Sequence, residues 1–598
     1  MNNSTETINK ESWLDRPIIP ALPKVTLEHL LITVILVLAV ISRFYIVGAR
    51  VMSHDEVNHV VPSYDLYLGT GYSHDPVTHG PLQFHLLAAS YFLFGDSDFS
   101  SRIPSALFSI ATIAFVLFAW RRFLGRTGAL LAGFFFLISP YMLFYGRYTR
   151  NESFVGLFSV VLLYAVLHYL EKGNHRTIYL YTIFLSLYYC TKETSFIFTA
   201  EMLIFLAFVF LKEISQLHWK KPRMLDGFIL SVIITLLFVG VALGAGVMGA
   251  KFGVETTDAV STTGIDPAIL NTATIVSVAL AAMTLLFAAF MLLSGFGWRR
   301  LRSVRSFDLI LLTLTLILPQ LIAFPISWLG WNPIDYSQQG LIRTSIALLV
   351  AVLVSLAIGL LWKPAVWLKN AVVFYAIFTV FYTTMFTNGQ GFFTGLVGSL
   401  GYWLSQQSVN RGTQPWYYYP LIQIPMYEYL AALGTLLTII LAFRHKVFSS
   451  IANLSPADQI AMEKAEEEAK IESELEAAGS TSGFLEEADT QEQIENTLES
   501  DADLIEIPEE ESKDPKKLPV VALLIYWTFM SLIAFTVAGE KMPWLTVHIA
   551  LPMLLASGFG IGYLVDTLIE QKWTWKSAIS LLLFPIFLIS FAKVIGSL

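Results

Sequence analysis

Long apolar segments, separated by shorter polar ones, recur along almost the whole chain. Most have about the 17 to 25 residues that an α-helix needs to cross the hydrocarbon core of a bilayer. The pattern predicts an all-α polytopic membrane protein with a bundle of about 13 to 15 transmembrane helices. The apolar segments are 28–49, 103–120, 128–145, 153–170, 178–197, 198–211, 227–249, 271–294, 307–329, 343–361, 371–386, 426–443, 519–537, 543–568 and 577–595.

The composition supports this class of protein. Of the 598 residues, 55% are hydrophobic and 14% are charged, and the mean hydropathy is +0.61. No soluble fold accounts for such values. The sequence holds neither a phosphate-binding loop nor a dinucleotide fingerprint. We expect membrane lipids, and no nucleic acid, among its partners.

The distribution of Lys and Arg predicts the orientation in the membrane. Basic residues gather in the turns after every second span, which marks those turns as cytoplasmic. The N-terminal segment, residues 1–27, is then cytoplasmic, and the long first loop, residues 50–102, is extracytoplasmic. The first apolar segment lacks a basic n-region and a cleavage site, so we expect it to remain as an anchor. The lone cysteine, Cys190, excludes an intramolecular disulfide.

Residues 456–517 differ from the rest of the chain. They hold 21 acidic residues and 5 lysines, a charge of −16 within a chain of net charge −8, so the other residues carry +8. We predict a largely disordered cytoplasmic loop, which is either a solvated linker or a docking segment for a partner. The predicted regions are 1–27 (cytoplasmic), 28–215 (catalytic transmembrane module), 216–455 (further helices and loops), 456–517 (acidic loop) and 518–598 (C-terminal helices).

An acidic pair, Asp55 and Glu56, follows directly after the first apolar segment. A carboxylate at the bilayer centre costs roughly 2.5–3.5 kcal/mol, and less near the interface. Catalysis on a membrane-bound substrate is one reason to place carboxylates there, and a solvated helix end is the other. Histidines are concentrated in the same loop, where a divalent metal site and ordinary polar contacts both remain possible. They are His54, His59, His74, His79 and His85.

Further charges occur on the predicted extracytoplasmic side. Arg150 and Glu152 lie in a short second loop, and Lys192 and Glu193 interrupt an otherwise apolar stretch. Ionisable groups in such stretches face a cavity rather than lipid, although local ion pairing is the alternative explanation. Later in the chain, cations on this side could bind a phosphate at the membrane surface. The candidates there are Arg411 and Lys541.

The order of these motifs resembles that of the GT-C glycosyltransferases, in particular protein O-mannosyltransferases and aminoarabinose transferases. The resemblance covers residues 28–215 and rests on the Asp-Glu pair, H-G-P-L, S-R-I-P-S-A-L at residues 101–107, R-N-E and T-K-E. The later motifs Q-P-W-Y-Y-Y and G-E-K-M-P-W resemble a prokaryotic subfamily labelled flippase-activity-associated, similar to proteins found beside archaeal N-glycosylation genes. Glu152 stands where relatives often carry Asp, and no soluble C-terminal recognition domain is evident.

The resemblance implies a glycosyltransferase in a prokaryotic plasma membrane. Because nucleotide sugars are absent outside the cytoplasm, we expect a polyprenyl-phosphate sugar, such as a mannosyl donor, and a lipid, glycan or protein acceptor. Asp55 is the predicted base for an inverting displacement. A lipid-linked sugar flippase and a non-catalytic subunit of a glycan assembly pathway are the alternatives. The other predicted site residues orient groups or bind substrate, and they are Glu56, Glu152, His54, His79, Arg150, Lys192, Glu193, Arg411 and Lys541.

Overall fold

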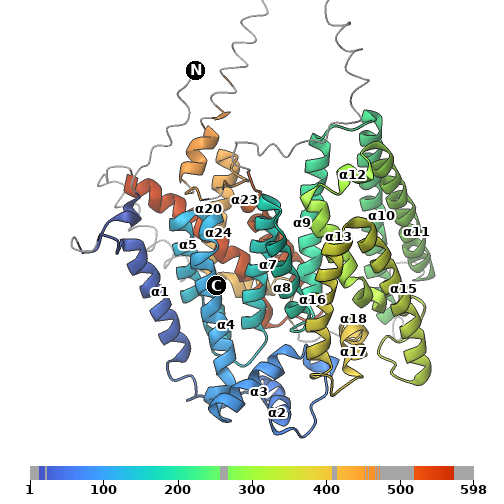
Figure 1. Ribbon diagram of the computed structural model, residues 1–598, viewed down its shortest axis with the longest axis horizontal. Helices are drawn as coiled ribbons and strands as arrows, with labels where there is room; N and C mark the ends of the chain where they lie inside the picture. The colour runs from blue at the N-terminus through green and yellow to red at the C-terminus, as the bar shows by residue number, and fades with distance from the viewer. Residues whose placement is uncertain are drawn as a thin grey trace, which may run out of the picture.

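The computed structural model describes residues 12–19, 23–255, 267–406, 414–451, 453–455, 457–464, 466–467, 471 and 517–570. Within these ranges every regular element is a helix (Figure 1). A helix satisfies its own backbone hydrogen bonds, which lipid cannot do, so a chain this apolar folds into a helical bundle. The predicted fold class is confirmed.

The main helices coincide with the predicted apolar segments. Eleven described helices are long and apolar enough to cross a membrane, or twelve if α19 and α20, bent by 106°, form one span. Two other predicted segments are helices of the bundle, but α8 has only 15 residues and α5 begins with a basic turn. The predicted segment 577–595 lies outside the described residues. The bounds are α1 Leu27–Phe44, α4 Asp98–Phe118, α5 Arg121–Ile138, α6 Pro140–Tyr145, α7 Glu152–Lys172, α8 His175–Tyr189, α9 Thr194–Gln216, α10 Pro222–Glu255, α11 Pro267–Gly295, α13 Arg305–Ile317, α14 Ala323–Trp328, α15 Gln338–Trp362, α16 Pro364–Tyr382, α18 Ser399–Gln406, α19 Ile424–Tyr427, α20 Tyr429–His445, α23 Val520–Val537 and α24 Thr546–Glu570.

Helix α24 lies at the centre of the bundle. It packs against α5, α20, α23 and α7, and its span is the most buried of the described spans, at 94%. Small residues allow this packing, since a Cβ atom on Gly558 would collide with the backbone of Gly128 and one on Gly434 with Ser557. The C-terminal helices are therefore integrated with the N-terminal module.

The first long loop forms a helical cap at one end of the bundle. It contains α2 (His54–Leu68), η2 (Pro76–Thr78) and α3 (Leu82–Phe94), and Figure 1 shows it opposite the N-terminal segment. The H-G-P-L motif attaches this cap to the corner between α8 and α9. Gly80 N–H donates to Thr191 O over 3.1 Å, and Leu82 N–H donates to Cys190 O over 2.9 Å. The prediction that this loop has structure of its own is confirmed.

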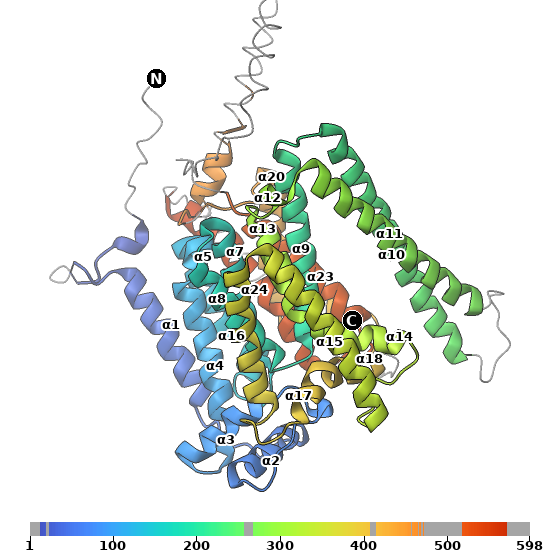
Figure 2. The same cartoon turned by 45° about the vertical axis from the view of Figure 1, so that its right-hand side comes forward.

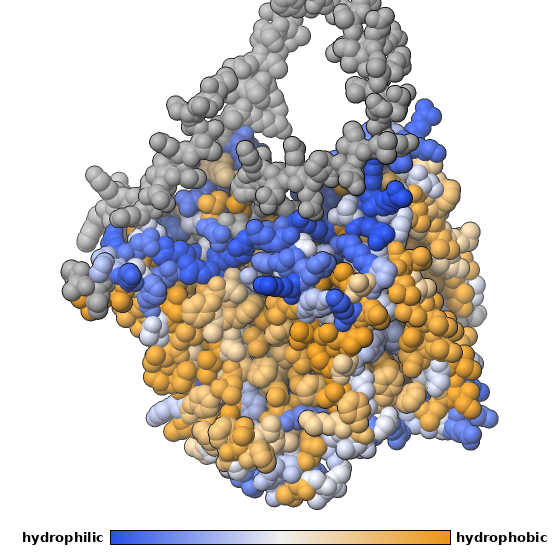
Figure 3. All heavy atoms as spheres, in the orientation of Figure 1, coloured by the Kyte–Doolittle hydropathy of each residue, from blue (hydrophilic) through white to orange (hydrophobic). Residues whose placement is uncertain are grey.

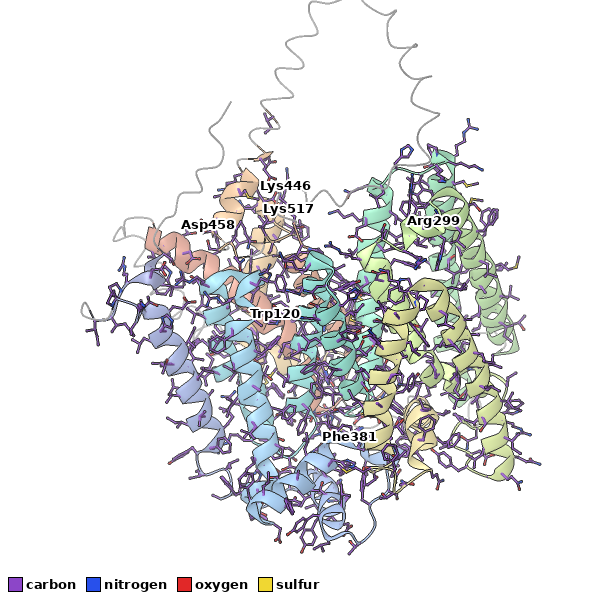
Figure 4. The ribbon with its side chains drawn as sticks, viewed as in Figure 1. Trp120, Arg299, Phe381, Lys446, Asp458 and Lys517 are labelled. Atoms are coloured by element: carbon purple, nitrogen blue, oxygen red, sulfur yellow. The ribbon has the colours of Figure 1, made fainter. Side chains whose placement is uncertain are left out.

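The opposite end of the bundle carries most of the charge. Hydrophobic side chains form a broad belt around the visible face, and hydrophilic ones gather at the end away from α2 and α3 (Figure 3). Lys446, Asp458 and Lys517 lie at that end, and Arg299 lies towards it (Figure 4). The first loop and the basic turns are thus on opposite sides of the protein.

One helical hairpin stands apart from the rest. Helices α10 and α11 pack closely on each other, but Figure 2 shows them leaning away from the bundle. Their spans are only 11% and 22% buried. Apolar helices exposed in this way are suited to contact with lipid on most of their surface.

We predict that Gly80→Ala destabilises the attachment of the cap. An added Cβ would collide with the Cys190 carbonyl and the backbone of Thr191, and such overpacking costs roughly 1–3 kcal/mol. Thermal unfolding in detergent should show a lower midpoint than for the wild type. Gly240→Ala is the control, because a Cβ there meets no atom within 4 Å. Equal midpoints for the two variants would contradict the assigned contact.

We also predict that Asp96→Cys reacts with an impermeant maleimide in intact cells, whereas Lys446→Cys reacts only after permeabilisation. Both positions are exposed, and they belong to opposite ends of the bundle. The lone native cysteine, Cys190, is fully buried, so the wild type serves as the unlabelled control. The reverse labelling pattern would overturn the predicted orientation.

Candidate functional site

The first predicted acid pair consists of two residues with different surroundings. Glu56 is fully buried, and its carboxylate accepts hydrogen bonds from Arg102 Nε and Nη2 at 2.8 and 2.9 Å. Arg50 Nη2 adds a third contact at 2.8 Å. Burial raises the pKa of Glu56, but the hydrogen bonds from Arg102, Ser53 N–H and Thr149 N–H and the charge of Arg102 together outweigh it, so the pKa lies below its usual value. Glu56 therefore stays charged and connects α2 to α4.

Glu56 also fixes the start of α2 and the second loop. Ser53 precedes the helix, and the Glu56 carboxylate accepts from Ser53 N–H at 3.1 Å in a capping box. The same carboxylate accepts from Thr149 N–H at 3.1 Å. These bonds place the loop that carries Arg150 directly beside the first turn of α2.

Asp55 lies on this first turn, facing outward. Its side chain is 41% exposed, and its only ion pair among the described residues is with Arg150, whose Nη1 lies 3.4 Å from Asp55 Oδ2. A carboxylate at a helix N-terminus is stabilised in its charged form by the helix dipole. Asp55 is thus a carboxylate that can be reached from solvent.

Behind Asp55 lies a buried group of three charges. Glu152 begins α7, and its carboxylate lies 2.5 Å from Lys192 Nζ and 3.3 Å from Arg150 Nε. The side chains of all three residues are at most 7% exposed. The structure therefore brings the R-N-E and T-K-E motifs together with the Asp-Glu pair.

The G-E-K-M-P-W motif completes this group from the C-terminal part of the chain. The Arg150 guanidinium lies 3.5 Å from the centre of the Trp544 ring, a close cation–π contact. The loop of Trp544 is held by Tyr419 of the Q-P-W-Y-Y-Y motif, because Tyr419 and the backbone of Met542 form two hydrogen bonds of 3.0 Å. Both late motifs thus support the same site.

A hollow of about 430 Å³, open to solvent, adjoins the charged group. Four segments supply its walls, namely the first loop, the corner before α9, α18 and the loop before α24. Its lining includes His79, Lys192, Glu193, Trp403, Glu540 and Trp544.

The histidines of the first loop have different surroundings, and buried His59 stacks on His79 with 6.5 Å between the ring centres. His79 Nδ1 lies 2.6 Å from Glu193 Oε2, and burial lowers the pKa of His74 to about 4. His85 contacts Pro81 O, and His54 is exposed. Across the described residues no three His, Cys, Asp or Glu side chains gather as a metal site would require. A divalent metal stays an untested prediction.

One predicted phosphate ligand, Lys541, is not part of the charged group, because its Nζ donates to Ala538 O at 3.1 Å. Another, Arg411, lies outside the described residues. Conversely, Arg102 and Trp544 belong to the site, although the sequence analysis assigned neither a role. The spacing Ser53-x-x-Glu56 is the signal that identifies Glu56 as a capping residue.

We predict that Glu56→Gln destabilises the protein far more than Asp55→Asn. The first change leaves Arg102 buried without its counter-charge, which costs about 3–5 kcal/mol, whereas Asp55 is partly exposed. Folding lowers the pKa of Glu56. The contribution of Glu56 to the free energy of unfolding is therefore fully present above the usual pKa of a glutamate, and it is lost as the pH falls below that value. Thermal unfolding in detergent at several pH values tests both statements. Equal midpoints for the two variants at neutral pH would refute them.

Comparisons with known proteins agree with the motifs. Residues 78–248 match the model of a family described as dolichyl-phosphate-mannose-protein mannosyltransferase. No curated protein matches the chain. One similar solved structure is the archaeal oligosaccharyltransferase AglB from Archaeoglobus fulgidus in complex with an inhibitory peptide and a dolichol-phosphate. The sequence identity is 11% and the TM-score is 0.42, and the match covers 95% of this chain and 55% of that one.

A second similar structure is ArnT from Cupriavidus metallidurans bound to undecaprenyl phosphate, at 14% identity and a TM-score of 0.26, over 64% of this chain and 79% of that one. The chain spans about half the length of AglB, at 55%. The resemblance to protein mannosyltransferases that the motifs predicted is confirmed by the family match over residues 78–248.

Proposed function

We propose that this protein transfers a sugar, such as mannose, from a polyprenyl-phosphate donor to an acceptor hydroxyl group. We further propose that it does so on the extracytoplasmic face of a prokaryotic plasma membrane. The observation that supports the proposal is the meeting of a reachable carboxylate, Asp55, with two buried cations, Arg150 and Lys192, at one end of the bundle. An acceptor hydroxyl needs a carboxylate to take its proton, and a departing phosphate needs cations to stabilise its charge.

The proposed reaction is a single displacement. The acceptor oxygen attacks the anomeric carbon while the bond from that carbon to the phosphate oxygen breaks. The hydroxyl proton passes to Asp55, and the bonding electron pair leaves with the polyprenyl phosphate. Attack from the face opposite the phosphate inverts the anomeric configuration, as in glycosidases that act by one displacement. A phosphate leaving group needs no general acid.

Charge balance indicates how the donor enters. Arg150 is shared between Asp55 and Glu152, and Lys192 is paired with Glu152, so the four groups together carry no net charge. A donor phosphate therefore competes with Asp55 for the Arg150 guanidinium. Its binding would release Asp55 from the ion pair and leave that carboxylate free to accept a proton.

Other parts of the hypothesis concern the acceptor and any cofactor. A lipid, a glycan and a protein hydroxyl are all compatible with an outward-facing Asp55. A divalent metal ion stays an untested prediction, and the proposed reaction assigns no step to it. His79 and Glu193 are proposed to contact substrate because both line the hollow.

We predict that Asp55→Asn lowers kcat by about 10²–10⁴-fold, the usual contribution of a general base. Donor affinity should be retained or increased, because the competing carboxylate is gone. Arg150→Ala and Lys192→Ala should weaken donor binding, and they should also lower kcat, since charge on the phosphate grows in the transition state. Transfer from a purified radiolabelled donor, with a separate donor-binding assay, measures both effects.

The control for this experiment is Asp65→Asn, a partly exposed carboxylate on the same helix, which should behave as the wild type. Normal turnover in folded Asp55→Asn would exclude Asp55 as the base. It would leave Glu56 or Glu152 as the base, whereas no transfer by the wild type would favour the two alternatives, a lipid-linked sugar flippase or a non-catalytic subunit.

A further inference from the structure

The hollow beside Arg150 contains a carboxylate that the proposed reaction does not use. Glu540 lines the hollow and is half-buried. The other acid there, Glu193, is engaged by His79 at 2.6 Å. By contrast, the Glu540 side chain has no hydrogen bond or ion pair to any residue that the structure describes. Its acceptor capacity is available to a bound molecule.

The charges around Glu540 define what the hollow can accept. Lys192 is the one lysine or arginine in the lining, and its ammonium is already paired with Glu152 at 2.5 Å. The lining therefore presents two carboxylates against one committed cation. An additional carboxylate on a ligand would meet like charge in a partly desolvated space, where repulsion is weakly screened.

The remaining walls suit a sugar ring. Trp403 and Trp544 enter the lining from separate segments, α18 and the loop before α24. Tryptophan rings provide flat apolar surfaces against which the C–H faces of a pyranose can pack, while carboxylates accept hydrogen bonds from its hydroxyl groups. The hollow is open to solvent, so a sugar can approach these walls from outside.

The position of the hollow relates it to the donor. Lys192 lies both in its lining and in the charged group, whereas Asp55 is not among its lining residues. A donor whose phosphate lies at Lys192 and Arg150 would therefore place its sugar in the hollow, with the acceptor approaching from the side of Asp55.

We propose that Glu540 is a specificity-determining residue that selects donors with an uncharged sugar and rejects those with a sugar carboxylate. The inference rests on the proposed transfer function and adds the class of sugar to it. Glu540 accepts a hydrogen bond from a hydroxyl group of the neutral sugar. A uronate at the same place is repelled.

The test compares two donors that differ only at C6, polyprenyl-phosphate glucose and polyprenyl-phosphate glucuronate, or the corresponding pair for the hexose that is transferred best. Wild type should prefer the neutral donor by at least tenfold in kcat/KM. Glu540→Gln should raise KM for the neutral donor with kcat nearly unchanged, and should reduce the preference at least threefold. Glu540→Lys should reduce it further or reverse it.

Asp96→Asn, an exposed acid at the same end of the bundle, is the matched control and should keep the wild-type preference. An unchanged preference in folded Glu540→Gln and Glu540→Lys, with the neutral donor still transferred, would overturn the role of Glu540 and leave the transferase function intact. No transfer from any donor by the wild type would instead overturn the proposed function, and this inference with it.

Discussion

The buried carboxylate of Glu152 is the interaction on which the site depends. It neutralises Lys192 and Arg150, two cations that could not otherwise remain in so apolar a bundle. Each comes from a different loop, so the shared carboxylate fixes the distance between them. Removal of Glu152 would leave two like charges buried side by side, which is far more costly than the loss of an exposed ion pair. The positions of the two cations are thus determined by the counter-charge that both of them need.

Helix α24 and the loop before it hold Arg150 in position. Trp544 covers Arg150, and it lies directly before the most buried span of the bundle. The other end of α24 is also fixed, because Asp566 accepts hydrogen bonds from Thr127 at 2.7 Å and Trp13 at 3.2 Å. A catalytic module limited to residues 28–215 would therefore lack the part of the chain that positions its arginine.

The sequence predicted the helices well because the physics of lipid is simple: apolar length determines which segments span, and each span satisfies its own backbone. The sequence predicted less well where helices break or bend, because tertiary contacts determine those positions. The apolar segment 128–145 is in fact two helices, broken at Ser139 before Pro140, a residue that cannot continue the preceding helix. The bend between α19 and α20 depends on Glu428, which accepts a 2.6 Å bond from Ser139.

In the candidate site, too, some features could be predicted from the sequence and others could not. Charges in apolar surroundings identified Arg150, Glu152, Lys192 and Glu193, because such charges need a reason. The charges alone did not separate the roles of Asp55 and Glu56, which are adjacent in sequence and are distinguished by the Glu56 contacts to Arg102 and Thr149. The meeting of Arg150 with Trp544 could not be predicted from spacing, since nearly four hundred residues separate them and the pairing arises from helix packing.

The two carboxylates closest to Arg150 have opposite exposures, and this difference explains how a neutral site can bind an anion. Glu152 is buried and cannot move away from the cations without a large desolvation penalty, whereas Asp55 is 41% exposed and can be solvated when it leaves Arg150. In the proposed reaction, an entering donor phosphate would therefore displace Asp55 rather than Glu152. The cations keep one fixed counter-charge throughout, and the carboxylate that is released is the one that an acceptor hydroxyl can reach.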